Sequence, residues 1–296
     1  MDDSTFPRIN VGEWAETALD WLTANFEGLF DAVSTGTNWV IDILNEVLLA
    51  PPPLLAIVIF ALIAWLIRSW QFAVGTAIAF SLIAAMDQWN NAMLTLALVL
   101  VATVVALVIA VPIGILAARN DAVSAIVKPL LDFMQTMPAF VYLIPAVIFF
   151  SIGVVPGVFA TVVFSLPPGV RFTELGIRGV DAETVEAGHA FGATPRQILR
   201  GIQLPLATPT IMAGVNQVIM LALSMAVIAG MVGADGLGKE VVSAIATLNT
   251  PKGVEAGLGV VVLAIFLDRI TAALGNPGEY SSSLYRVLRG RATSRA

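Results

Sequence analysis

The sequence contains one short stretch whose glycine and lysine spacing is typical of phosphate binding. Residues 233–239 read GADGLGK and fit G-x-x-x-x-G-K, a pattern in which backbone amides and a lysine hold the phosphates of a nucleotide. Glu240 stands where the Mg²⁺-binding serine or threonine of such a loop belongs, and an apolar segment rather than a strand precedes it. We therefore interpret these glycines as the irregular exit from an apolar helix, with no bound nucleotide.

Few other residues could carry out chemistry. His189 is the only histidine and there is no cysteine, which excludes disulfides, thiolate nucleophiles and histidine or cysteine metal sites. Asp268 and Arg269 adjoin near one end of an apolar segment, where an ion pair that reaches the membrane interface is favoured over a buried functional site. We expect no catalytic residue and no metal ligand in this chain.

Some polar and aromatic side chains lie within apolar segments. Asn216 and Gln217 could hydrogen-bond to a neighbouring helix or line a transport pathway, and the sequence leaves both alternatives open. Residues 133–150 carry five aromatic rings, and such rings recognise quaternary ammonium groups, although rings on membrane spans more often pack or face lipid. The candidate pathway-lining residues are Phe140, Tyr142, Asn216 and Gln217.

The composition requires a membrane. The chain has 296 residues, of which 58% are hydrophobic and only 12% are charged. A soluble domain carries about a quarter charged residues. The apolar runs are long, so we predict an all-α membrane protein with about seven transmembrane helices. We expect the spans near 52–68, 71–87, 93–118, 129–153, 155–170, 208–232 and 254–274.

The basic residues predict the orientation of these spans. Arginine and lysine gather in residues 68–70, 119–128, 171–207 and 275–296, all of which lie on one side if the chain has seven spans. Cytoplasmic loops carry the excess of basic residues. We therefore expect the N-terminus outside and the C-terminus inside, with 171–207 as a cytoplasmic loop and 276–296 as a basic cytoplasmic tail.

Residues 1–50 form a separate acidic region. They contain nine acidic residues but only one basic residue, Arg8, and they lack the positive start and apolar core of a signal peptide. Their pattern predicts two extracytoplasmic amphipathic helices, one near 11–33 and a shorter one near 39–48. Such helices pack on their own protein or lie on the membrane face, and we keep both alternatives.

The basic loop has an internal order of its own at residues 186–205, EAGHAFGATPRQILRGIQLP. Asp181 can cap a first helix, and Gly192 can end that helix in a left-handed conformation. Thr194 and Pro195 fit the N-cap and first position of a second short helix that ends at Gly201. An exposed helix–glycine–helix element is either a docking surface or a packed connector.

This stretch resembles the cytoplasmic signature of the permease subunits of bacterial ABC importers, E-A-x-x-x-x-G followed by nine residues and I-x-L-P. Gly188 stands where a second alanine is usual, and a small residue is kept there. Residues 134–158, 165–177 and 204–231 further resemble the glycine betaine/proline importer permeases. The residues assigned to the ATPase-coupling loop are Glu186, Ala187, Gly188, Gly192, Ile202, Leu204 and Pro205.

The resemblance implies a type I ABC importer permease fold in the bacterial cytoplasmic membrane. It implies two copies of an ATPase subunit that bind ATP and Mg²⁺, a permease homodimer, and an extracytoplasmic substrate-binding protein, with no cofactor and no nucleic acid on this chain. The implied substrate is glycine betaine or a related compound: proline betaine, choline, carnitine or trimethylamine N-oxide. The alternatives are an ion-driven secondary transporter, which would need charges in mid-span, and a non-transporting scaffold.

Overall fold

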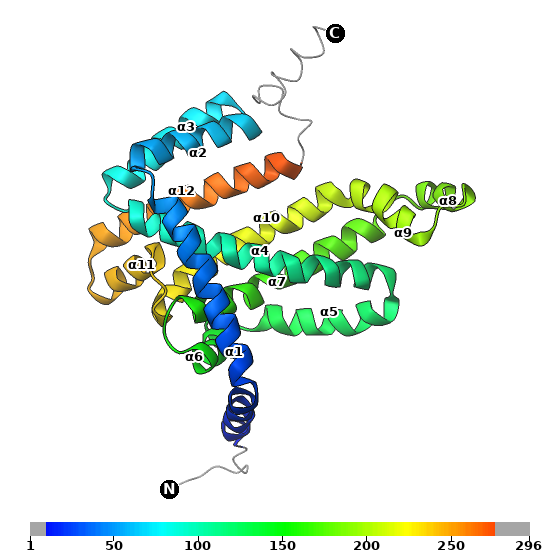
Figure 1. The fold of residues 1–296 in the computed structure, drawn as a ribbon, viewed down its shortest axis with the longest axis horizontal. Helices are drawn as coiled ribbons and strands as arrows, with labels where there is room; N and C mark the ends of the chain where they lie inside the picture. The colour runs from blue at the N-terminus through cyan, green and yellow to red at the C-terminus, as the bar shows by residue number, and fades with distance from the viewer. Residues whose placement is uncertain (1–9, 276–296) are drawn as a thin grey trace, which may run out of the picture.

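The computed structural model describes residues 10–275, so the basic tail expected at 276–296 lies outside the described residues. Within this range the secondary structure is entirely helical (Figure 1). The α-helices are α1 (Val11–Leu49), α2 (Pro53–Ile67), α3 (Trp70–Ala85), α4 (Trp89–Arg119), α5 (Asp121–Thr136), α6 (Leu143–Phe150), α7 (Val154–Arg178), α8 (Ala182–Ala190), α9 (Pro195–Ile198), α10 (Leu204–Ala229), α11 (Leu237–Ala246) and α12 (Thr250–Gly275). Three short elements of other helical type are η1 (Ala139–Tyr142), η2 (Leu199–Gln203) and η3 (Gly230–Val232).

Long helices that run in roughly the same direction form the body of the molecule (Figure 1). α4, α7 and α10 pack against one another, and α12 packs on α10. α8 and α9 project at one end of this bundle, whereas α11 lies at the opposite end (Figure 1). Between residues 10 and 275, length and composition qualify four helices as membrane spans, or up to six if each of two bent helix pairs is one span.

The spans expected at 52–68 and 71–87 are α2 and α3, which pack against each other as a hairpin. Ser69 begins α3 by accepting a hydrogen bond from the Phe72 N–H, so the turn falls within residues 68–70, one of the basic segments expected between spans. α3 has 16 residues, about 24 Å at 1.5 Å per residue, which is short for a hydrocarbon core of about 30 Å. The expected number of about seven spans therefore counts two helices that are each shorter than a complete crossing.

Residues 129–153 are not the single straight span that the sequence predicted. α5 ends at Thr136, and the pair formed by α5 and the segment 139–150 is bent by 107°. Met137 is extended, with ψ of 132°, because it precedes Pro138 and a proline disfavours helical backbone in the residue before it. The sequence did not predict this break, because residues 137–153 are mostly apolar.

Two other boundaries differ from the expected ones. The two amphipathic helices expected before residue 50 are one helix, α1, which bends where Phe26 has non-helical angles. α7 continues from the expected span 155–170 to Arg178, although it contains Pro167 and Pro168. Both prolines are buried within the bundle, where neighbouring helices can surround the interrupted backbone.

Close packing at glycines joins the three central helices. A β-carbon on Gly114 of α4 would lie 2.5 Å from Thr173 Cβ and 2.7 Å from the Val170 carbonyl oxygen of α7. A β-carbon on Gly214 of α10 would lie 2.5 Å from Phe172 Cβ, also on α7. Helices in a bilayer gain little from hydrophobic burial against one another, so such close backbone approach contributes much of their association.

This packing predicts that Gly114→Ala destabilises the bundle. The added methyl would force α4 and α7 apart, at a cost of about 1–3 kcal/mol, and we expect a lower midpoint of thermal unfolding. Gly75→Ala in α3 is the matched control, because a β-carbon there meets no atom within 4 Å. Alanine should be neutral or stabilising by up to about 1 kcal/mol at that helical position. Equal midpoints for the two variants would contradict this account of the core.

Candidate functional site

The first helix of the projecting element begins and ends as the sequence predicts. The Asp181 carboxylate accepts hydrogen bonds from the Thr184 N–H at 3.3 Å and from the Thr184 hydroxyl at 2.9 Å, which caps α8. Gly192 follows α8 with φ of +79°, in the left-handed region that other residues seldom adopt. No atom lies within 4 Å of a β-carbon built on this glycine. The backbone angle alone therefore favours glycine here over residues with a branched side chain.

The second helix begins as expected but does not end at Gly201. Thr194 and Gln197 form a reciprocal capping box, with the Thr194 N–H donating to Gln197 Oε1 at 2.7 Å. α9 then passes through the π-helical turn η2 directly into α10. The stretch Pro195–Val232 thus qualifies as one helix of 38 residues. The element is an extension of a long helix rather than a loop tied to it.

Several signature residues fix this element to the body of the protein. Ile198 and Leu199 are buried, and Leu199 belongs to an apolar cluster with Ile177 of α7 and Ala207 of α10, onto which Leu204 packs. A β-carbon on Gly188 would lie 2.7 Å from Ile202 Cδ1, so the missing side chain brings α8 close to η2. Gly188, Ile202 and Leu204 therefore have a role in internal packing.

Other signature residues face outward. Glu186 and Ala187 on α8 are exposed, as is Pro205 at the start of α10. Phe191, which the sequence analysis did not single out, is 92% exposed beside Gly192 at the tip of the element. An aromatic side chain next to a helix-ending glycine in an otherwise polar stretch is the signal that could have identified it. These outward side chains form a surface suited to a partner protein.

A buried carboxylate near this element was also missed. Glu174 of α7 is 4% exposed, and its Oε1 accepts a hydrogen bond from Ser124 at 2.7 Å. Lys128 Nζ lies 3.2 Å and Arg178 Nε 3.0 Å from the same oxygen. The i, i+4 spacing of Glu174 and Arg178 could be read from the sequence, but the partners on α5 could not.

A second layer of ion pairs extends the same contact between α5 and α7. Arg178 Nη2 lies 2.7 Å from Asp121 Oδ1 and donates to the Ala117 carbonyl oxygen of α4 at 2.8 Å. Arg171 forms an ion pair with Asp132. The acidic and basic groups at this end of the bundle therefore join α4, α5 and α7, close to where α7 leads into the projecting element.

The four candidate pathway residues lie in different environments. Asn216 Nδ2 donates to Asp268 Oδ1 at 2.8 Å, and the Thr271 hydroxyl donates to Asn216 Oδ1 at 2.8 Å, so Asn216 joins α10 to α12. Gln217 is exposed on α10. Phe140 is exposed on η1, whereas Tyr142 is buried and its hydroxyl donates to the Met134 carbonyl oxygen. Asn216 and Tyr142 therefore have packing partners within this subunit, whereas Gln217 and Phe140 face outward.

The glycine-rich stretch at 233–239 packs against the start of α4. The Leu237 N–H donates to Thr95 Oγ1 at 2.8 Å, and a β-carbon on Gly236 would lie 2.5 Å from that oxygen. Lys239 Nζ lies 2.7 Å from Asp235 Oδ1, and this hydrogen bond raises the pKa of Lys239 above its ordinary value. The glycines thus allow a close structural contact, in keeping with an irregular helix exit.

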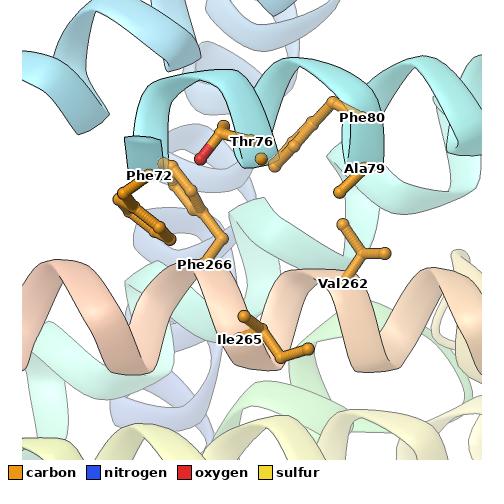
Figure 2. A pocket seen from close by; sticks show the side chains of 8 residues that line it. Phe72, Thr76, Ala79, Phe80, Val262, Ile265 and Phe266 are labelled. Atoms are coloured by element: carbon orange, nitrogen blue, oxygen red, sulfur yellow. The ribbon is translucent and has the colours of Figure 1, made fainter. Parts of the chain in front are cut away.

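An apolar cavity of about 270 Å³ lies between α3 and α12, and Figure 2 shows the side chains that line it. Phe80 and Phe266 meet edge to face there, with ring centroids 5.2 Å apart. Phe60 of α2 stacks on Phe80 with ring centroids 4.8 Å apart. The aromatic contacts hold the α2–α3 hairpin on α12, and we assign this cavity to packing rather than to the transport pathway.

A helical bundle with several apolar helices long enough to cross a membrane, in the part of the chain that the structure describes, defines a multi-pass membrane protein. Residues 110–276 match the family described as "Binding-protein-dependent transport system inner membrane component". The chain therefore belongs to this family. It is a non-catalytic membrane subunit located in the inner membrane.

Relatives that match most of the chain include two betaine transport permeases. The chain is 51% identical over 265 residues to the glycine betaine transport system permease protein OpuAB of Bacillus subtilis (strain 168). The matched region covers 90% of this chain and 94% of that protein. It is 47% identical over 267 residues to the glycine betaine/proline betaine transport system permease protein ProW of Escherichia coli (strain K12). That match covers 90% of this chain and 75% of ProW.

A solved structure shares the fold. An inward-facing conformation of the MetNI methionine ABC transporter superposes with a TM-score of 0.58 at 22% identity, over 62% of this chain and 92% of that chain. The fold is therefore that of type I ABC importer permeases, as the sequence predicts.

The ion cluster predicts that Glu174→Leu lowers stability. The change leaves the buried Ser124 hydroxyl without its acceptor and removes the shared partner of Lys128 and Arg178, at a cost of about 1–3 kcal/mol. Glu174→Gln, which keeps an acceptor, should cost less. The midpoint of thermal unfolding measures both, and Glu27→Leu on the exposed surface of α1 is the control. If Glu174→Leu unfolds at the same temperature as this control, the cluster does not join α5 to α7.

Proposed function

We propose that this chain forms the translocation pathway of an ATP-driven importer and that its 181–205 element couples it to a separate ATPase. The observation that carries the proposal is the continuity of α9, η2 and α10, which makes the exposed element an extension of a membrane-spanning helix. A partner that moves α8 and α9 would also move α10. Phe191 supplies an exposed apolar anchor for a groove on that partner.

The substrate class follows from the relatives. Their names include glycine betaine, proline betaine, carnitine, choline and trimethylamine N-oxide transport systems. We infer that this permease imports a compound of this quaternary ammonium or betaine type. An extracytoplasmic binding protein delivers the substrate, and two permease copies form the pathway between them.

The mechanism converts ATPase closure into movement of the spans. When ATP and Mg²⁺ bind between two ATPase subunits, the subunits approach and carry the two docked elements with them. α10 follows through η2, and α7 follows through the apolar cluster of Ile177, Leu199 and Ala207. The pathway then changes from inward-open to outward-open. In this arrangement residues 1–50 lie outside, and 171–207 and 276–296 lie in the cytoplasm.

The coupling role predicts that Gly192→Val and Ala187→Asp impair the complex without unfolding the permease. Valine at φ of +79° strains the turn by about 1–2 kcal/mol or more. That strain should reduce ATPase affinity roughly three- to thirtyfold. Gly192→Asn should remain close to wild type, because asparagine tolerates the left-handed conformation. Aspartate at the exposed Ala187 would place an unpaired charge in the contact.

The measurements are ATPase co-purification, and glycine betaine uptake with ATP hydrolysis in reconstituted vesicles. Gly257→Val is the matched control, because this glycine lies in α12 and a β-carbon there meets no atom within 4 Å. Wild-type coupling in both loop variants would contradict the assignment of the element. Uptake that follows an ion gradient without ATP would instead identify a secondary transporter.

A further inference from the structure

The cavity between α3 and α12 contains a buried hydroxyl without a partner in the described chain. Thr76 is 4% exposed, and its Oγ1 has no hydrogen-bond partner among residues 10–275. A buried threonine in a helix can donate to the carbonyl oxygen four residues earlier. Four buried threonines of the long helices do so: Thr95, Thr161, Thr173 and Thr271. Thr76 and Thr103 do not, and of these two Thr76 lines the cavity.

The hydroxyl of Thr76 is directed into the cavity. In Figure 2 its oxygen points toward the rings of Phe72 and Phe266. Both rings line the same space of about 270 Å³. Aromatic faces are weak hydrogen-bond acceptors, so they do not replace a carbonyl oxygen. The hydroxyl therefore requires an acceptor on a molecule that enters the cavity.

The cavity opens on the outer apolar surface of the bundle. Ile265, which lines it, is 53% exposed, and Val261 on the same helix is 51% exposed. Ile78 of α3 is 67% exposed. Only 33% of the most apolar part of α12 is buried within the described chain. Hydrocarbon surrounds such a surface in a membrane, so the molecule that can enter is a lipid.

One end of the cavity is positively charged. The Arg68 guanidinium lies over the ring of Phe72, 5.6 Å from its centroid, and Arg68 Nη1 donates to the Arg269 carbonyl oxygen at 3.2 Å. The Arg269 side chain is 53% exposed, and Asp268 lies 3.6 Å from its Nε. Two arginines and one aspartate leave a net positive charge at this end. Guanidinium groups are well suited to phosphate.

The depth of these groups matches the layers of a phospholipid. Trp70 begins α3 beside Arg68 and is 55% exposed, and tryptophan favours the headgroup level of a membrane. Thr76 is six residues further, ~9 Å along the helix at 1.5 Å per residue. The polar boundary on each side of the hydrocarbon is about 5–7 Å deep. Thr76 therefore lies near its inner edge, where lipid ester carbonyls are the available acceptors.

We propose that the cavity between α3 and α12 binds one phospholipid. Its phosphate lies at Arg68 and Arg269, an ester carbonyl oxygen accepts a hydrogen bond from Thr76, and one acyl chain extends between the helices toward Val262. Every phospholipid class supplies these groups, so phosphatidylcholine is sufficient. A second permease copy in a two-fold contact centred here would bring its own arginines against this pair, which favours lipid as the occupant. The lipid joins the α2–α3 hairpin to α12.

A photoreactive lipid tests the proposal. The full transporter complex is reconstituted in vesicles of phosphatidylcholine that carries a diazirine in one acyl chain. After illumination, mass spectrometry compares labelling at residues 262–266, beside the cavity, with labelling at 54–59 on the exposed surface of α2. Gly75→Leu fills the cavity, because a β-carbon on Gly75 meets no atom within 4 Å. Gly257→Leu is the matched control, an equally open glycine of α12 that does not line the cavity.

We expect residues 262–266 to be labelled at least three times as strongly as 54–59. Gly75→Leu should remove this excess, and Gly257→Leu should keep it. Thr76→Val, which preserves the shape but removes the donor, should lower the labelling of 262–266 two- to threefold.

Equal labelling of 262–266 in the wild type and Gly75→Leu would show ordinary surface lipid and overturn the proposal. Absence of label from 262–266 in the wild type would overturn it in favour of coverage by protein, such as a second permease copy. Unchanged labelling in Thr76→Val would contradict the hydrogen bond on which the site is built. None of these outcomes affects the ATPase assignment, which the coupling variants test separately.

Discussion

Close contact between α4, α7 and α10 is the constraint on which the rest of the structure depends. In lipid the helices cannot associate by excluding water, so they must approach until their backbones nearly touch. Gly114 and Gly214 allow this on both sides of α7, where added β-carbons would lie 2.5 Å from Thr173 and Phe172. Because the three helices fit in one arrangement, side chains at their ends are held in fixed positions. The projecting element of α8 and α9 and the ion cluster around Glu174 both depend on this.

Polar side chains then determine how α5 and α12, on either side of this core, are attached to it. Glu174 on α7 accepts a hydrogen bond from Ser124 and forms an ion pair with Lys128, both on α5. These polar contacts attach α5, which precedes the 107° bend, to α7. On the other side Asn216 links α10 to Asp268 and Thr271 of α12. A polar side chain with partners on two helices specifies which helices meet, whereas apolar contacts in lipid discriminate less.

The sequence predicted those features that depend on neighbouring residues. Apolar length identified α4, α7, α10 and α12, and the caps at Asp181 and Thr194 identified α8 and α9 because capping is local chemistry. The bend at Met137 was missed because the apolar run continues past Pro138. The cluster around Glu174 was missed because Ser124 is 50 residues away and only the folded bundle brings the two together. The roles of Glu186 and Ala187 depend on a partner and remain predictions.

Glycines at the two ends of α10 have opposite consequences for movement. Beyond its last turn, a β-carbon on Gly230 would lie 2.4 Å from Lys239 N, and one on Gly238 would lie 2.5 Å from the Ala226 carbonyl oxygen, so this end is in backbone contact with α11. At the other end Gly192 meets no atom within 4 Å, and the turn between α8 and α9 stands clear of the bundle. A force on the projecting element therefore acts on a long helix whose far end is held. Because α10 also packs closely on α7 at Gly214, the coupling mechanism that we propose requires α7 and α10 to move together, with the smallest displacement where α10 meets α11.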